Sequence, residues 1–223
     1  MKNPYKKHFL ISALSLFAFL TLTALLMFVD VKSIGPNGSS VGLATLNGWT
    51  HNLFGLNMTL YDITDWAGLL PVFIALSFAV IGLCQLIKRK SIMQVDSSIL
   101  TLGVFYLIVF GAYMFFEGCV VNYRPVLING FLEASYPSST TLLAACIMPT
   151  AMMQYSRMIK NKKTVCTINA VCAVFTAMMI IGRLISGVHW LTDIVAGVLL
   201  SVSFVTLYAA VNEYIAYRKN EKR

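Results

Sequence analysis

Long apolar runs separated by short polar segments dominate this chain. A helix needs about 20 apolar residues to cross the ~30 Å hydrocarbon core of a bilayer. Six runs approach that length, at about residues 9–29, 66–87, 98–116, 138–155, 165–183 and 188–208. The pattern predicts an all-α, polytopic membrane bundle of six transmembrane helices, built as a single integral membrane domain over residues 1–223. The last run is expected to continue as a helix toward Tyr217.

The first run follows a basic start, which is also how a signal peptide begins. The apolar stretch is longer than the ~7–15 residues of a signal-peptide core. The residues after it, Asp30-Val-Lys-Ser, contain no small-x-small cleavage site. We therefore expect this run to be retained as the first membrane span.

The segment 30–65 is longer and more polar than the other connections. It contains four leucines at near-helical spacing, Leu43, Leu46, Leu53 and Leu56. They suggest a short helix in the membrane interface, which could serve as a lid or a lipid entrance. A plain connecting loop fits the same segment, and both interpretations stay open. His51 has no partner at helical spacing, so we expect a solvated loop histidine.

The basic residues are distributed unevenly over this pattern. All but three of the 17 lysines and arginines fall at the N-terminus, after the second and fourth runs, or at the C-terminus. In a six-span topology these places share one side, which the positive-inside rule makes the cytoplasm. Both termini are therefore expected there. The exceptions, Lys32, Arg124 and Arg183, fall on the outer face.

The remaining composition agrees with a membrane protein. Charged residues make up 12% of the chain, against roughly 25% in soluble domains. The net charge of +8 is explained by the cytoplasmic flanks, which contact anionic membrane lipids, so nucleic acid is not expected as a partner. Five cysteines show no metal-ligand spacing, and we expect neither a zinc site nor a structural disulfide. Short loops favour a bacterial inner membrane.

The stretch that joins the last two runs, residues 182–193, carries three ionisable side chains near a bilayer, where such residues are costly and usually functional. His189 and Asp193 are four apart, which puts them on one helical face. A carboxylate against one imidazole nitrogen leaves the other free to act. Arg183 is a planar cation suited to phosphate. Taken alone, the stretch fits a buried ion pair between two helices equally well.

Two more outer-face segments carry compatible groups. Arg124 lies in the loop after the third run, and residues 136–141, Tyr-Pro-Ser-Ser-Thr-Thr, open the fourth. Pro137 suits a helix start, where free N–H groups form an anion site. Alone, the second segment is better explained as helix capping. Beside two arginines and a histidine on one face, phosphate binding is favoured.

These segments resemble the motifs of the type 2 phosphatidic acid phosphatase (PAP2) superfamily, which comprises integral membrane lipid phosphatases. The family's third motif reads Ser-Arg-x5-His-x3-Asp. Arg183, His189 and Asp193 match it at the right spacing, with Gly182 where the family usually has serine. The resemblance covers most of the chain from about Trp66 onward.

The other two motifs, Lys-x6-Arg-Pro and Pro-Ser-Gly-His, are matched only in part. Arg124-Pro125 fits the first, with Glu117 in place of lysine. Pro137-Ser138 fits the second, with Ser139 in place of glycine and Thr140 in place of histidine.

The resemblance implies a role for each matched residue. His189 would be the nucleophile that forms a phosphohistidine, and Asp193 would orient and activate it. No metal or other cofactor would be needed. A divalent cation at this pair is less favoured, because no other ligand pairs with it at helical spacing. The substrate phosphate would be bound by Arg124, Arg183, Ser138, Ser139 and Thr140.

The replacement at Thr140 bears on the substrate. In the family, the second-motif histidine protonates the departing oxygen, and a threonine hydroxyl is no usable acid near neutral pH. General acid catalysis is typically worth ~10²–10⁴-fold, so hydrolysis of an alkyl phosphate should slow. A leaving phosphate, with a second pKa of about 6, departs without much protonation. This favours a lipid diphosphate. The alternative, that Thr140 inactivates an ordinary enzyme, stays open.

Glu117 exchanges a positive charge of the first motif for a negative one. Near a phosphate it should repel. It could instead pair with Arg124 or Arg183, or replace the missing proton donor if burial raises its pKa. A plain loop carboxylate at the end of the third run fits as well.

Taken together, the sequence predicts an outer-face lipid phosphatase, with undecaprenyl diphosphate as the first choice of substrate and phosphatidic acid or phosphatidylglycerol phosphate as the second. The rival is a relative that binds a lipid phosphate without turnover, favoured by the loss of the motif lysine and histidine. Retention of His189 and Asp193 argues against that rival, since a pure binder needs only the arginines. The sequence leaves the oligomeric state open.

Overall fold

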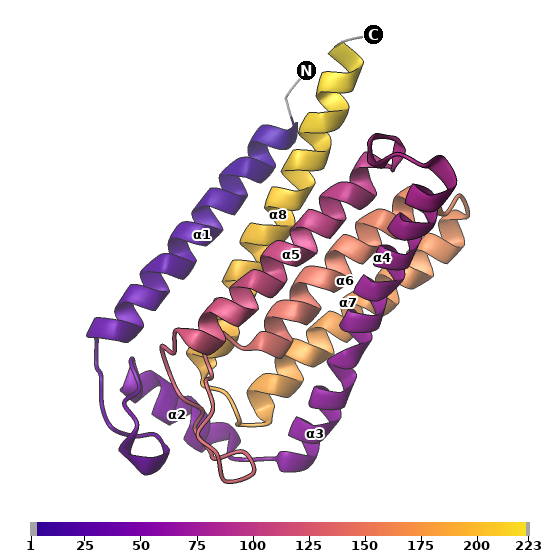
Figure 1. Ribbon diagram of the computed structural model, residues 1–223. Coiled ribbons are helices and arrows are strands. Elements are labelled where there is room, and N and C mark those ends of the chain that lie inside the picture. The colour runs from indigo at the N-terminus through magenta and orange to yellow at the C-terminus, as the bar shows by residue number, and fades with distance from the viewer. Residues whose placement is uncertain (1–3, 222–223) are drawn as a thin grey trace.

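A computed structural model describes residues 4–221, which form an all-α bundle with no strand among them (Figure 1). The helices are α1 (Pro4–Phe28), α2 (Ala44–Phe54), α3 (Met58–Ala67), α4 (Leu69–Arg89), α5 (Ser97–Gly118), α6 (Ser139–Met158), α7 (Lys162–Ile185) and α8 (Leu191–Glu221). Two short 3₁₀ turns, η1 (Pro36–Gly38) and η2 (Ile92–Gln94), lie in the connections. The all-α prediction is confirmed.

Within residues 4–221, five helical stretches are long and apolar enough to cross a membrane: Tyr5–Phe28, Met58–Arg89, Ser97–Gly118, Lys162–Ile185 and Leu191–Glu221. The sixth long helix, α6, is not among them. Its neighbours are α4, α5, α7 and α8, and most of its side chains are buried. A helix covered by other helices presents little surface to lipid, which explains why α6 can carry polar residues such as Thr150 and Gln154.

The second predicted span begins too late in the sequence. We expected it at about residue 66, yet the helical stretch starts at Met58, as α3, and continues into α4 with a break only at Gly68. The Asn57 side chain caps α3 by accepting a hydrogen bond from the Leu60 amide at 2.9 Å. The polar residues of α3, including Asp65, interrupt the apolar run and hide the helix from a hydropathy reading.

The segment 30–65 is not a plain loop, because it contains η1, α2 and most of α3. In α2, Leu46 and Leu53 are exposed, as expected for a helix at a membrane interface. His51 lies on this helix and not in a loop. Its ring is half-buried, with its centroid 5.5 Å from that of Trp190, so the prediction of a solvated histidine is wrong.

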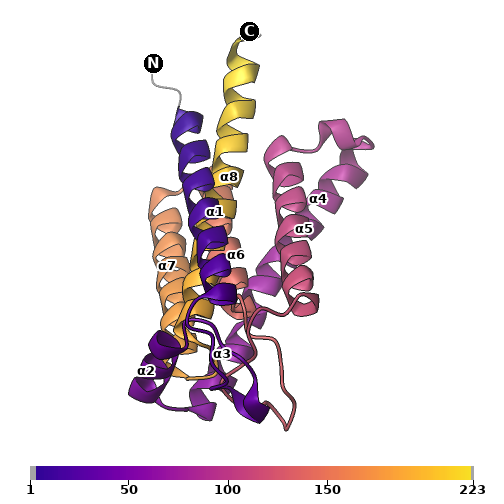
Figure 2. The same cartoon turned by 90° about the vertical axis from the view of Figure 1, so that its left-hand side faces the viewer.

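Helix α1 packs along α8 and closes one side of the bundle (Figure 2). Two reciprocal hydrogen bonds join them: the Ser12 hydroxyl donates to the Ser203 carbonyl at 2.9 Å, and the Ser203 hydroxyl donates to the Ser12 carbonyl at 3.0 Å. Hydroxyls of this kind link helices where water is absent. Figure 2 shows α4 and α5 standing to one side of α1, α6, α7 and α8.

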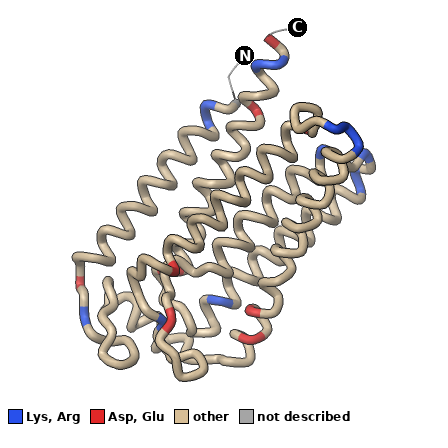
Figure 3. Tube along the Cα trace, viewed as in Figure 1, with Lys and Arg blue, Asp and Glu red and all other residues tan. Residues whose placement is uncertain are grey.

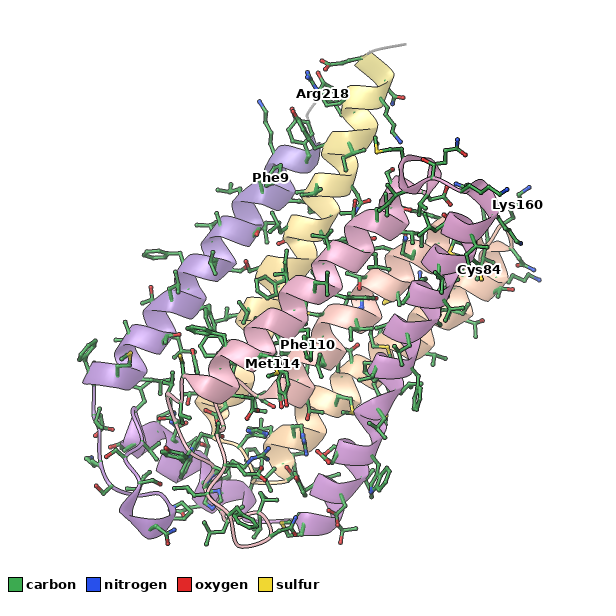
Figure 4. All side chains as sticks on the ribbon, viewed as in Figure 1. Phe9, Cys84, Phe110, Met114, Lys160 and Arg218 are labelled. Atoms are coloured by element: carbon green, nitrogen blue, oxygen red, sulfur yellow. The ribbon has the colours of Figure 1, made fainter. Side chains whose placement is uncertain are left out.

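Charge separates the two ends of the bundle. Most lysines and arginines gather at the end that holds both termini (Figure 3), where Lys160 and Arg218 lie (Figure 4). The opposite end holds α2, α3 and the loop between α5 and α6. Those of the assigned basic groups that fall within residues 4–221 thus lie at one end of the structure.

Candidate active site

Four of the predicted site residues come from four different places at the end of the bundle opposite the termini. Arg183 lies in the last turn of α7, and Asp193 lies in the first turn of α8. Arg124 belongs to the loop between α5 and α6. His189 lies in the α7–α8 connection, before α8 begins at Leu191. The two residues of the expected helical pair are therefore not on one helix.

His189 and Asp193 are linked through a third residue. Their closest atoms, Nδ1 and Oδ2, are 3.8 Å apart, which is too long for a direct hydrogen bond. Ser135 bridges them: its Oγ lies 3.1 Å from His189 Nδ1, and its hydroxyl donates to Asp193 Oδ2. Since the serine proton goes to the carboxylate, Ser135 Oγ accepts from Nδ1–H. The His189 tautomer is thereby fixed.

The free nitrogen of His189 is Nε2. It is buried and has no hydrogen-bond partner among the described residues. With the proton on Nδ1, Nε2 carries a lone pair. Burial, and then the positive charges of Arg124 and Arg183, hold the pKa of His189 well below its usual value of 6.5. The imidazole is therefore neutral near pH 7 and nucleophilic.

Asp193 also shapes the backbone around the histidine. Its Oδ2 accepts a hydrogen bond from the Trp190 amide at 2.8 Å. An acidic side chain in the first helical turn that reaches back to the residue before the helix is half of a capping box. The Asp193 carbonyl accepts from the Ser138 amide at 3.1 Å, which ties the start of α8 to the start of α6. The same carboxylate thus fixes the loop that carries His189.

Arg183 is buried, with 1% of its side chain exposed, and it faces α3 and α6. Nη2 donates to Asp65 Oδ1 at 2.8 Å and to Thr140 Oγ1 at 2.6 Å. Nη1 donates to Thr64 Oγ1 at 3.3 Å and to the Tyr61 carbonyl at 3.4 Å. The close approach of α3 also explains Gly182, because a Cβ there would lie 2.7 Å from Thr64 Cγ2.

Arg124 is held by a similar arrangement on the loop. Its amide donates to the Glu133 carbonyl at 3.0 Å, and its Nε lies 3.1 Å from Glu133 Oε2. Neither Nε nor Nη1, both buried, has a partner that meets hydrogen-bond geometry in the part of the chain that the structure describes. The Tyr61 ring approaches both guanidinium groups, with its centroid 5.8 Å from Cζ of Arg124 and 4.9 Å from Cζ of Arg183. Both arginines therefore border one region of the site.

The start of α6 differs from a simple helix cap. Ser138 precedes the helix, but its hydroxyl makes no capping bond and is buried without a partner. Ser139 and Thr140 form the first turn, whose amides have no acceptor within the helix. The explanation by side-chain capping thus fails for Ser138, whose hydroxyl has no hydrogen-bond partner among the described residues.

A small cleft lies beside His189. Glu117, at the end of α5, and Ser139, in the first turn of α6, share its lining with the histidine. The remaining walls are mainly aromatic or apolar, from Tyr113, Phe116, Tyr136, Pro137 and Leu142. Glu117 forms no hydrogen bond or ion pair with another described residue, so it pairs with neither arginine here.

Sequence reasoning missed Ser135 and all of the α3 contribution. A serine in a loop has no spacing signal that connects it to a histidine more than 50 residues away. The signal available in α3 was the presence of Tyr61, Thr64 and Asp65 on one flank of an apolar stretch, where polar groups need a partner.

Comparison with known proteins agrees with this geometry. The sequence model of the PAP2 superfamily matches residues 105–216. The fold resembles that of a PAP2-type phosphatidylglycerolphosphate phosphatase from Bacillus subtilis, with a TM-score of 0.62 and 18% identity over 92% of this chain and 96% of that chain. A search of curated proteins gives no match. This integral membrane chain belongs to the PAP2 superfamily, a family of membrane lipid phosphatases.

Proposed function

We propose that the protein removes a phosphate group from a membrane lipid phosphate or diphosphate, with His189 as nucleophile. The observation that carries this proposal is a set of buried polar atoms without partners in one region. They include His189 Nε2, Ser138 Oγ, Arg124 Nη1 and Arg183 Nε. Buried polar groups are almost always satisfied, so their grouping favours this region as a binding site for a polar ligand. Three of these atoms are donors, which suits an anion.

The chemistry follows from the same atoms. His189 Nε2 attacks phosphorus and forms a P–N bond while the bond to the lipid oxygen breaks. The resulting cationic imidazole keeps Nδ1–H on Ser135, whose hydroxyl relays the interaction to the Asp193 carboxylate. Water then cleaves the P–N bond and releases phosphate. The guanidinium groups stabilise the charge on the phosphoryl oxygens.

The substrate proposal depends on the leaving group. Thr140 Oγ1 accepts a hydrogen bond from Arg183, so its position offers no titratable acid to a departing oxygen. A phosphate leaving group needs less protonation than an alkoxide. Undecaprenyl diphosphate is our first choice, and phosphatidic acid or phosphatidylglycerol phosphate is the second.

The proposal includes a placement in the membrane. One integral domain over residues 1–223 would have six spans, with α6 as the sixth, packed among α4, α5, α7 and α8. The basic end would face the cytoplasm by the positive-inside rule, together with both termini. The site would then open at the outer face of a bacterial inner membrane.

A second candidate is binding of a lipid phosphate without turnover. The observations that favour it are the acidic Glu117 on the cleft, and the Thr140 hydroxyl engaged with Arg183. Such a binder would not need the Ser135 bridge between His189 and Asp193, which has no role in holding phosphate.

Phosphate release by purified, detergent-solubilised protein tests the function. Undecaprenyl diphosphate and phosphatidic acid would be assayed in parallel. We expect turnover of both, with the diphosphate faster by about 10²-fold because it needs no general acid. Equal rates would refute the leaving-group argument. Saturable binding without release would establish the second candidate.

Replacing Ser135 with alanine tests the relay. We expect Ser135→Ala to lower kcat by about 10- to 100-fold, because the remaining 3.8 Å between Nδ1 and Oδ2 is too long to orient the ring. KM should stay nearly constant, since the serine contacts no phosphate-binding group. Ser156→Ala, on the exposed cytoplasmic end of α6, is the matched control. A rise in KM with unchanged kcat would contradict the role.

A further inference from the structure

The guanidinium of Arg183 has little hydrogen-bonding capacity left. Arginine has five N–H donors. Nη2 uses its two on Asp65 and Thr140, and Nη1 uses its two on Thr64 and the Tyr61 carbonyl. Nε–H is the remaining donor, and it is buried without a partner. A phosphate that reaches Arg183 as it stands can therefore take one hydrogen bond.

Phosphate normally binds arginine through two parallel hydrogen bonds. Nε and Nη2 form one edge of the planar group, so a phosphate on the free Nε–H would take its second bond from Nη2. The partners on Nη2 are the Asp65 carboxylate and the Thr140 hydroxyl. One of them has to leave for the second bond to form.

Asp65 is the partner that can leave at low cost. Its side chain is 55% exposed, whereas Thr140 and Thr64 are buried. Water can solvate a carboxylate that swings off the guanidinium, but it cannot reach a buried hydroxyl. The Tyr61 carbonyl belongs to the backbone of α3 and cannot move away on its own.

We propose that Asp65 is a built-in competitor for the substrate phosphate on Arg183. It neutralises the buried guanidinium in the empty site, yields to a phosphoryl oxygen on binding, and returns when phosphate departs. This inference rests on the proposed function. Competition by Asp65 lowers the affinity of the site for inorganic phosphate. The product therefore dissociates, and the ion pair between Asp65 and Arg183 forms again.

Arg124 carries the same kind of arrangement. Its Nε faces Glu133, whose side chain is 43% exposed, while its Nη1 is buried and unpartnered. Each arginine of the site thus faces one exposed carboxylate and keeps at least one buried donor that has no hydrogen-bond partner among the described residues. In both pairs the carboxylate is the exposed partner, so water can solvate it when a ligand of higher charge takes its place on the guanidinium.

The test is calorimetric titration of the solubilised full-length protein with inorganic phosphate, which requires no turnover. Asp65→Asn should bind phosphate about two- to fivefold more tightly than the native chain, since the competing ion pair is lost. Asp62→Asn is the matched control. It removes the same charge from an exposed position on the same helix, has no contact with Arg183, and should leave the affinity unchanged.

The outcomes separate this proposal from the function on which it rests. Unchanged or weaker binding in Asp65→Asn, with an unaltered melting temperature, would mean that Asp65 positions Arg183 and does not compete. Equal tightening in both variants would reveal a general charge effect and overturn the proposal. Asp65→Ala serves as a second variant that removes the contact altogether. Lipid turnover is assayed separately. If only the enzymatic proposal is wrong, no lipid is turned over, but Asp65→Asn still binds inorganic phosphate more tightly than the native chain.

Discussion

Replacing His189 with alanine is expected to abolish phosphate release, with a fall in kcat of about 10⁴-fold or more. The Nε2 atom is the one nucleophilic nitrogen that the site leaves unbonded, and Ser135 fixes its tautomer. No neighbouring side chain can replace it, because the nearby hydroxyl of Ser138 has no base to accept its proton. Binding of phosphate should survive, since both arginines remain.

His51→Ala is the control for this prediction. His51 lies at the same end of the bundle, beside Trp190, but is not one of the residues proposed to bind phosphate. We expect its kcat to match that of the native chain. Substantial turnover in His189→Ala, measured with the same lipid and detergent, would assign the nucleophile to another group or to water.

Replacing Thr140 with histidine is expected to change the choice of substrate. A histidine there would supply the missing acid to a departing alkoxide, so turnover of phosphatidic acid should rise by about 10²-fold. Undecaprenyl diphosphate should change much less, because its leaving group needs little protonation. The ring would have to fit between Arg183 and Gly68, where a Cβ built on Gly68 lies 3.1 Å from Thr140 Cγ2. The gain is therefore expected at the low end of the usual range.

Thr140→Gln is the control that separates the effect of a titratable proton from the effect of a larger side chain. Glutamine is comparable in bulk and hydrogen-bonds to arginine, but it has no titratable proton near neutral pH. The ratio of the two lipid rates should therefore shift in Thr140→His alone. An equal shift in both variants would mean that Thr140 controls the fit of the substrate and not its protonation.

Much of the fold was predictable because membrane spans are long and chemically uniform. Apolar runs placed α1, α5 and α7 to within a few residues at most boundaries. The basic flanks correctly predicted which helix ends lie together at one end of the bundle. The start of α3 was missed because its polar residues face the site and break the apolar run. The polar residues of α6 have a different explanation, because neighbouring helices cover that helix.

The site was predictable where the motif fixes spacing, and not where partners come from distant segments. Arg183, His189 and Asp193 do lie together, but His189 precedes α8, so the expected helical geometry was wrong. Contacts through Ser135 and Asp65 depend on how loops and α3 pack, which no local pattern encodes. Glu117 lines the cleft with His189, a contact that its place at the end of the third apolar run did not reveal.

The most direct test of the account is to trap the phosphorylated protein. The purified chain would be mixed with undecaprenyl diphosphate labelled in its terminal phosphate, quenched in alkali within the first turnover, and digested for mass spectrometry. The account predicts label on the peptide that contains His189, stable to alkali and lost in acid, as expected for a phosphorus–nitrogen bond. Release of phosphate at the normal rate with label on no peptide, or on a peptide without His189, would contradict it.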